Sequence, residues 1–261
     1  MKCIIAVSLL AGLALASPMM DRAKLELQAR NAARRTNRFR ASKDGGFGNI
    51  TATTVQSSNW GGSAIVTSGV TEVSGTFTVP KPSIPSGGSS SRDYCGAAWV
   101  GIDGYSNSAL IQTGVLWCVQ GTSFEYEAWY EYLPAALIGY SGFSVTSGNS
   151  VTVTVTKTST SGGTTTISAN GRSASHTFSG QSTKLQGASA EWIVEDFTSG
   201  SSLVPFADFG TVTFTGATAV INGATVQASA DSPVNIELVS SSGSVLTSTS
   251  VSGSTVTVEY Q

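Results

Sequence analysis

Val151-Thr152-Val153-Thr154-Val155-Thr156 alternates valine with threonine over its whole length. Successive side chains of a β-strand point to opposite faces, so one face of this segment is all valine and the other all threonine. The pattern is typical of an antiparallel strand with one face in a hydrophobic core and the other in water. Thr211-Val212-Thr213-Phe214-Thr215 repeats it further along the chain.

Other strand-like runs surround these two segments, and glycine pairs such as Gly87-Gly88 and Gly162-Gly163 supply the turns. The sequence therefore predicts an all-β fold, a sandwich of two antiparallel sheets in a single domain. The expected strands are 73–79, 97–102, 123–133, 151–157, 164–169, 191–197, 211–215, 234–239 and 255–260.

The first fifty residues differ from the rest in composition. Residues 1–16 contain Lys2, a nearly unbroken apolar run and the signature Ala14-Leu15-Ala16, which together predict a secretory signal peptide. Residues 17–50 follow as a pro-segment that suits a helix, and residues 51–261 form the β-sandwich domain. No later apolar run is long enough to span a membrane. We therefore expect a secreted, extracellular protein.

The charge is distributed unevenly between pro-segment and domain. Residues 17–50 hold eight basic and three acidic residues, a net charge of about +5. Residues 51–261 hold five basic and thirteen acidic residues, a net charge of about −8. The signal peptide argues against nucleic acid as the partner of the basic arm. The charges instead suggest a removable pro-segment that lies on an acidic face.

Several chemistries are excluded by missing residues. The chain has a single histidine, His176, and no G-x-S-x-G motif that would hold a nucleophilic serine, so a Ser-His-Asp hydrolase is not expected. No His/Cys cluster suits zinc, and no loop suits calcium or a phosphate. The sequence therefore predicts neither a metal nor a cofactor.

Two cysteines, Cys95 and Cys118, remain once Cys3 leaves with the signal peptide. In a secreted domain such a pair is expected to form a disulfide, and the alternative is two unpaired thiols. A bond would tie together the segment that carries Asp103 and Gln112.

Ala190-Glu191-Trp192-Ile193-Val194-Glu195-Asp196-Phe197 places three acids within six residues. Read as a strand, it points Glu191 and Glu195 to the same face as Ile193. A carboxylate on such a face is either buried and paired or lies in a cleft, where carboxylates transfer protons. The competing interpretation is an exposed acid at a strand end.

Aromatic residues beside acids and amides mark the other candidate positions. They are the segments Asn59-Trp60-Gly61-Gly62, Trp99 to Gly104, Ile111 to Gly114 and Tyr126 to Glu131. Aromatics beside carboxylates line both sugar-binding and peptide-binding clefts, although most tryptophans are expected in the core. Trp60 is the best candidate to face a ligand, because its glycine neighbours permit close approach.

These segments, in this order and spacing, resemble the fungal glutamic peptidases (eqolisins). The matching motifs are S-N-W-G-G, W-V-G-I-D-G, Q-T-G-V, A-W-Y-E, A-E-W-I-V-E-D-F, F-A-D-F-G-x-V-x-F and the closing S-V-S-G-x-x-V-T-V, from about Ser57 to Tyr260. The resemblance implies two seven-stranded sheets and an acid-active endopeptidase with a glutamine and glutamate dyad. It places the catalytic residues at Gln112 and Glu195, with Glu191 as the fallback.

The resemblance also places the family's substrate-cleft tryptophan at Trp60, and Trp99, Asp103 and Glu131 of the candidate segments are further predicted substrate-binding residues. The chain departs from its relatives in several places, and at one of them Leu116 stands where they carry an acid four residues after the glutamine. Leu116 is expected to alter subsite preference and pH profile more than activity. In the implied mechanism, Glu195 takes a proton from water while the Gln112 amide stabilises the oxyanion.

Two rival functions remain open on the sequence alone. One is a β-sandwich glycoside hydrolase with two catalytic carboxylates, for example Glu131 and Glu195. The other is a non-catalytic binding module, for which the basic pro-segment would have no purpose. For the peptidase, the expected partners are polypeptide substrates and the chain's own pro-segment as inhibitor. Nucleic acid and membrane are not expected partners, and the protein is expected to be a monomer.

Overall fold

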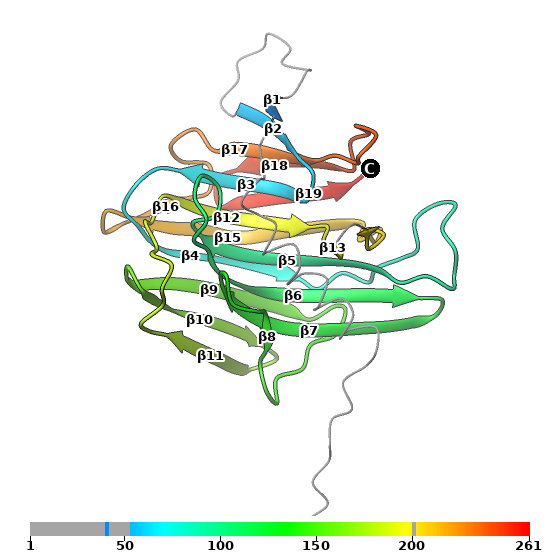
Figure 1. Ribbon diagram of the computed structural model, residues 1–261, viewed down its shortest axis with the longest axis horizontal. Helices are drawn as coiled ribbons and strands as arrows, with labels where there is room; N and C mark the ends of the chain where they lie inside the picture. Colours follow the sequence, from blue (N-terminus) through cyan, green and yellow to red (C-terminus); the bar gives the residue numbers. More distant parts are fainter. Residues whose placement is uncertain (1–39, 42–52, 200–201) are drawn as a thin grey trace, which may run out of the picture.

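The computed structural model describes residues 40–41, 53–199 and 202–261, and every regular element in these ranges is a β-strand. The strands form a sandwich of two large sheets (Figure 1). The predicted signal peptide and nearly all of the predicted pro-segment, with its expected helix, lie outside the described residues. The exception is Arg40–Ala41, a strand that pairs with Gln56 and Val55.

The first sheet has nine strands, and its central strands carry the acid-rich and glutamine-containing segments. Their order is β1 (Arg40–Ala41), β2 (Thr53–Ser57), β17 (Val234–Leu238), β3 (Trp60–Val66), β12 (Ser189–Glu195), β5 (Tyr94–Ile102), β6 (Ile111–Gln120), β7 (Ser123–Tyr132) and β8 (Ile138–Gly139). The pair of β2 with β17 is parallel, and the other described pairs in this sheet are antiparallel.

The second sheet has eight strands and packs against the first. Its order is β11 (Arg172–Phe178), β10 (Gly162–Ala169), β9 (Ser150–Ser159), β4 (Val70–Thr78), β15 (Thr211–Ile221), β19 (Thr255–Tyr260) and β18 (Thr247–Ser252), with β16 (Ala224–Gln227) beside β15. A short separate ribbon pairs β13 (Thr198–Ser199) with β14 (Ser202–Leu203). Without the two-residue β1 and β8 and the short β16, each large sheet has about seven strands, which confirms the predicted sandwich.

The core between the sheets explains the alternating valines of β9. Val151, Val153 and Val155 are fully buried in it. On the opposite face of β9, the Thr152 hydroxyl is 2.8 Å from that of Thr76 on β4. The alternation therefore sorts valine into the core and threonine into cross-strand hydrogen bonds, as a half-buried strand requires.

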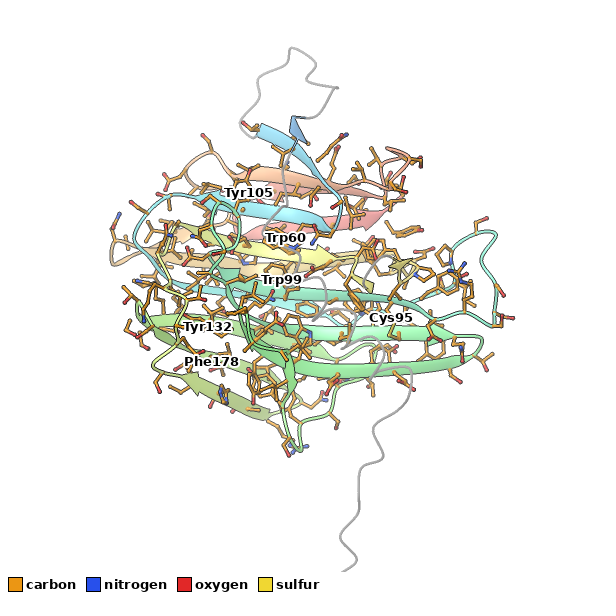
Figure 2. The ribbon with its side chains drawn as sticks, in the orientation of Figure 1. Trp60, Cys95, Trp99, Tyr105, Tyr132 and Phe178 are labelled. Atoms are coloured by element: carbon orange, nitrogen blue, oxygen red, sulfur yellow. A yellow bond between two sulfur atoms is a disulfide. The ribbon has the colours of Figure 1, made fainter. Side chains whose placement is uncertain are left out.

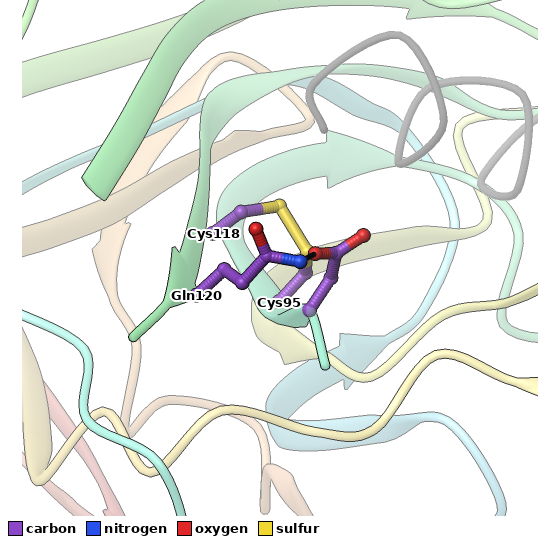
Figure 3. The surroundings of a disulfide bond; sticks show 4 residues. Cys95, Cys118 and Gln120 are labelled. Carbon is purple, nitrogen blue, oxygen red and sulfur yellow. Dashed lines mark hydrogen bonds between the residues drawn. A yellow bond between two sulfur atoms is a disulfide. The ribbon is translucent and has the colours of Figure 1, made fainter. Parts of the chain in front are cut away.

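The predicted disulfide is confirmed. Cys95 on β5 lies directly opposite Cys118 on β6, with a Cα–Cα distance of 4.1 Å (Figure 3). The two positions face each other because the β5–β6 hairpin has the register that pairs Gly101 with Gln112. The bond therefore fixes, from the far end of the hairpin, the two strands that hold Gln112 in place.

Candidate active site

The two faces of the first sheet have different compositions. The face toward the second sheet carries apolar residues such as Ala98, Val100 and Trp192, which belong to the main core. The opposite face, called here the outer face, carries the odd-numbered residues of β12 and β5 and the even-numbered residues of β6, because directly opposed residues share a face. Glu191 and Glu195 therefore lie on the same face, as the alternation of the sequence predicts, and the register of the sheet adds Gln112 to that face.

Four residues of the outer face form a row across four strands, called here the glutamine row. Glu191 pairs with Gly101, Gly101 with Gln112, and Gln112 with Glu131. Gly101 has no side chain, so nothing in the row itself stands between Glu191 and Gln112. With strands about 4.8 Å apart, the Cα atoms of Glu191 and Gln112 are about 10 Å apart in a flat sheet.

Gln112 is fully buried, and Glu131 is 1% exposed. The Gln112 Nε2 donates a short hydrogen bond to the Glu131 Oε2. The Gln112 Oε1 is also buried and accepts no hydrogen bond from the described residues. The structure thus brings together Gln112 and Glu131, two of the predicted site residues, and holds the amide nitrogen of one against the carboxylate of the other.

Glu195 lies four residues along β12 from Glu191, in a second row. Its neighbours in that row are Trp60 on β3 and Ala97 on β5, followed by Leu116 on β6. At about 3.3 Å per residue, the Cα of Glu195 is about 16 Å from that of Gln112 in a flat sheet. The register therefore places the fallback Glu191, and not Glu195, in the glutamine row.

The carboxylate of Glu195 is fully buried and accepts hydrogen bonds on both oxygens. The Trp99 Nε1 donates to the Glu195 Oε2 at 2.9 Å, and the Asn59 Nδ2 donates to the Oε1 at 3.2 Å. The two N–H donors hold the carboxylate of Glu195 in one orientation on the outer face.

Asn59 lies in a segment that the sequence marks as a candidate site, but sequence reasoning gave the residue no role because attention went to Trp60. The Ser57 Oγ donates to the Asn59 Oδ1 at 3.1 Å and accepts from the Trp60 backbone N–H at 3.1 Å. With its oxygen engaged in this way, Asn59 presents its NH2 group to Glu195. The sequence feature that could have given Asn59 a role is the polar pair Ser58-Asn59 directly before Trp60, where β3 begins.

Trp99 lies between Glu195 and the glutamine row. Its Nε1 reaches Glu195, while its Cζ3 is 2.9 Å from the place a Cβ would occupy on Gly101. Gly101 therefore makes room for the indole, while a Cβ at Gly114 would meet the Ala98 carbonyl oxygen and the Trp99 Cβ, so Gly114 permits the close approach of the β5 backbone. Trp60 packs edge-on against it, with ring centroids 5.0 Å apart (Figure 2). The structure therefore brings together Trp60, Trp99 and Glu195.

β6, the strand that carries Gln112, is also held by hydrogen bonds on its core-facing side. Thr113, its neighbour on β6, points into the core, where its hydroxyl is 3.1 Å from the Tyr140 hydroxyl. Tyr140 in turn donates to the Thr165 Oγ1 of the second sheet at 2.9 Å. Burial raises the pKa of the Tyr140 hydroxyl, although the hydrogen bonds to both threonines lower it. The phenol therefore keeps its proton and links β6 to β10.

Asp103 has both carboxylate oxygens engaged in the fold. It is fully buried and has a positive φ of 71°. Its Oδ2 accepts the N–H groups of Gln186 and Gly187 at 2.7 and 3.0 Å, and its Oδ1 accepts that of Ala188 at 2.8 Å. The Asn107 Nδ2 donates to the same Oδ1 at 2.9 Å. These contacts join the end of β5 to the segment that leads into β12. Asp103 therefore helps to hold these two strands, which carry Trp99 and Glu195, in their relative positions.

Replacing Asp103 by asparagine is expected to destabilise the fold by about 3 kcal/mol, because an NH2 group would then face backbone N–H donors that lose their acceptor. Asparagine tolerates a positive φ, so this change tests the hydrogen bonds and not the backbone conformation. Chemical denaturation measures the loss, with the exposed Glu259→Gln as a control expected within about 0.5 kcal/mol of the parent. Equal stability of Asp103→Asn and the parent would contradict the supporting role.

The described residues contain no group of three or more metal-ligating side chains. They also contain no helix that is long and apolar enough to cross a membrane. His176, to which the sequence assigned no catalytic part, stacks on the Tyr130 ring with centroids 4.2 Å apart.

Comparisons with known proteins agree on one family. The sequence profile described as the Peptidase A4 family matches residues 58–260. The chain is 42% identical over 275 residues to Aspergillopepsin-2 of Aspergillus niger, covering 97% of this chain and 96% of that protein. It is 38% identical over 245 residues to Scytalidopepsin B of Scytalidium lignicola, covering 89% of each.

Solved structures give the same result for the fold. Scytalido-glutamic peptidase with a transition state analog inhibitor superposes with a TM-score of 0.69 at 36% identity, covering 78% of this chain and 98% of that one. Aspergilloglutamic peptidase from Aspergillus niger gives a TM-score of 0.60 at 48% identity, covering 64% of this chain and 99% of that one.

Proposed function

The chain belongs to the Peptidase A4 family and is a glutamic endopeptidase that hydrolyses peptide bonds, and we propose that Glu195 and Gln112 are its catalytic dyad. Membership of this family decides against the two rivals, a glycoside hydrolase and a non-catalytic binding module. Polypeptides are the substrates that the family implies.

The observation that best supports this dyad is the position of Trp99. Its indole reaches from Glu195 to the glutamine row, and the Trp60 ring packs edge-on against it. A peptide group of the substrate that lay across this ring would have Glu195 on one side and Gln112 on the other. Trp60 and Trp99, whose rings are both buried beside Glu195, are assigned the substrate-binding role that the sequence predicts for them.

The chemistry follows from what amide hydrolysis needs. Glu195, ionised, takes a proton from water as the oxygen attacks the carbonyl carbon, and later gives that proton to the leaving amine. The Gln112 NH2 group donates to the oxyanion that forms, at any pH, because an amide does not titrate. Glu191 is the alternative base, because it shares the row of Gln112. Digestion of casein at acid pH, with the variants described in the Discussion, tests the assignment.

We further propose that the protein is secreted through the signal peptide at 1–16, matures by loss of the segment 17–50 and works as a monomer. The eight basic residues give that segment a net charge of about +5, which matches the net charge of about −8 on the domain. Unlike charges hold the two together while the carboxylates are ionised. As pH falls toward the ordinary carboxylate pKa of about 4, the domain loses negative charge, the attraction weakens and the pro-segment dissociates.

A synthetic peptide of residues 17–50, added to the active enzyme, is therefore expected to inhibit more strongly as pH rises from acid to neutral. Added salt should weaken the inhibition, because salt screens exposed charges. Inhibition constants measured over pH and ionic strength check this, with a peptide of the same composition in scrambled order as control. Inhibition that responds to neither pH nor salt would contradict the electrostatic mechanism.

A further inference from the structure

Gln112 has two chemically different ends, and only one arrangement of them suits catalysis. The NH2 group donates hydrogen bonds and the carbonyl oxygen accepts them, yet the two ends have nearly the same shape. A rotation of the terminal amide by half a turn exchanges them at little steric cost. A glutamine that stabilises an oxyanion therefore needs a neighbour that distinguishes nitrogen from oxygen.

Glu131 is placed to make that distinction. The two residues are direct cross-strand partners on β6 and β7, and the Gln112 Nε2 donates to the Glu131 Oε2. An ionised carboxylate only accepts hydrogen bonds, so it attracts the amide nitrogen and repels the amide oxygen. Both side chains are buried, which strengthens the preference because water does not compete for the contact.

The other end of the amide is consistent with this arrangement. The Gln112 Oε1 is buried and has no hydrogen-bond partner among the described residues. The nitrogen keeps a second N–H after it has donated to Glu131. One contact therefore fixes the whole amide, with a donor and an acceptor in defined directions before any substrate arrives.

We propose that Glu131 is a positioning residue that fixes the amide of Gln112 in its catalytic orientation, a proposal that rests on the catalytic part proposed for Gln112. Glu131 then acts through Gln112 and transfers no proton itself. This gives the glutamate of the A-W-Y-E segment a part other than substrate binding, for which the sequence had marked it.

Two substitutions of Glu131 separate orientation from charge. Glu131→Leu removes the acceptor, and kcat is expected to fall about 30-fold with KM within about threefold, less than the 10²–10³ of a lost oxyanion donor. Glu131→Gln keeps an acceptor but can turn its own amide, so kcat should fall only about 3- to 10-fold. The matched control is Glu127→Gln on the same face of β7, in the row of Leu116, with kcat expected within about twofold of the parent.

The side-chain amide of Gln112 supplies a readout that does not depend on activity. Its ¹⁵N–¹H₂ signals, assigned by their absence in Gln112→Ala, should include one proton shifted strongly downfield by the contact with Glu131. That shift should vanish in Glu131→Leu and be reduced in Glu131→Gln, while Glu127→Gln leaves it in place. The spectra are recorded on the protein as the expression host secretes it, without further truncation.

The outcomes distinguish the positioning role of Glu131 from the catalytic role of Gln112, on which it rests. A fall in kcat together with loss of the downfield signal supports positioning by Glu131. Loss of either one without the other overturns it, as does an unchanged kcat in Glu131→Leu when Gln112→Ala is inactive. If Gln112→Ala itself keeps full activity, the catalytic part of Gln112 is wrong, whatever Glu131 does. Should Glu131→Leu fail to fold, the nearly isosteric Glu131→Gln decides by the same two measurements.

Discussion

Glu195→Gln is expected to lower kcat by at least about 10³-fold, because the change removes the group that both accepts and returns the proton. A neutral amide cannot take a proton from water at any pH at which the fold survives. Trp99 can still donate to the new side-chain oxygen, so the indole should stay in place. Hydrolysis of a fluorogenic peptide at acid pH, at substrate concentrations well above KM, measures the loss.

The fold of this variant needs its own measurement. The new NH2 group faces the Asn59 NH2 group, which Ser57 holds in its orientation, so stability should fall by about 1 kcal/mol. Thermal unfolding and near-UV circular dichroism should otherwise match the parent. Activity above a few per cent of the parent, in a correctly folded variant, would show that Glu195 is not the base.

Gln112→Ala is expected to lower kcat by about 10² to 10³, the size of effect that follows loss of one oxyanion donor. The substrate should still bind, because Trp60 and Trp99, which are proposed to bind it, remain, so KM should change much less than kcat. Steady-state kinetics on the same peptide separate the two constants. Since Glu131 loses its partner in this variant, its stability should be measured alongside.

Gln112→Glu tests the same position without making a cavity. A carboxylate at 112 would repel Glu131 and the oxyanion, and could donate only when protonated, so kcat should again be low. A lower pH should restore part of it. Near-normal turnover of both Gln112 variants would rule out the dyad.

Much of the fold could be predicted from the sequence where a strand has one buried and one exposed face. The alternation of β9 and β15 shows this directly, and the predicted 151–157 and 211–215 both lie within strands. β6 was not predicted as a strand, because nearly all of Ile111–Gln120 is buried on both faces and shows no alternation. β3 was also missed, because Gly61 and Gly62 weaken its strand propensity, although close packing against Trp192 requires Gly62.

The site could be predicted in part. Alternation alone places Glu191 and Glu195 on one face of β12, and that prediction is confirmed. What alternation cannot give is the register between strands, which decides that Gln112 shares a row with Glu191 and Glu131. The hydrogen bonds of Asp103 to the 186–188 segment join parts of the chain far apart in sequence, so only the folded structure reveals them.

The choice between the two glutamates of β12 remains the central question for catalysis. Glu191 has the shorter path to Gln112 across Gly101, whereas Glu195 has two N–H donors and the Trp99 indole beside it. Both are fully buried on the same face of the same strand, so a glutamine at either site replaces a buried carboxyl group by an amide of nearly the same size. The two variants are therefore natural controls for each other.

The decisive measurement is kcat for Glu195→Gln and Glu191→Gln side by side, on one peptide, at one acid pH, with thermal unfolding of both. If Glu195 is the base, Glu191→Gln keeps turnover within about tenfold of the parent, while Glu195→Gln loses at least about 10³-fold. An inactive but folded Glu191→Gln beside an active Glu195→Gln would contradict the assignment and make Glu191 the partner of Gln112.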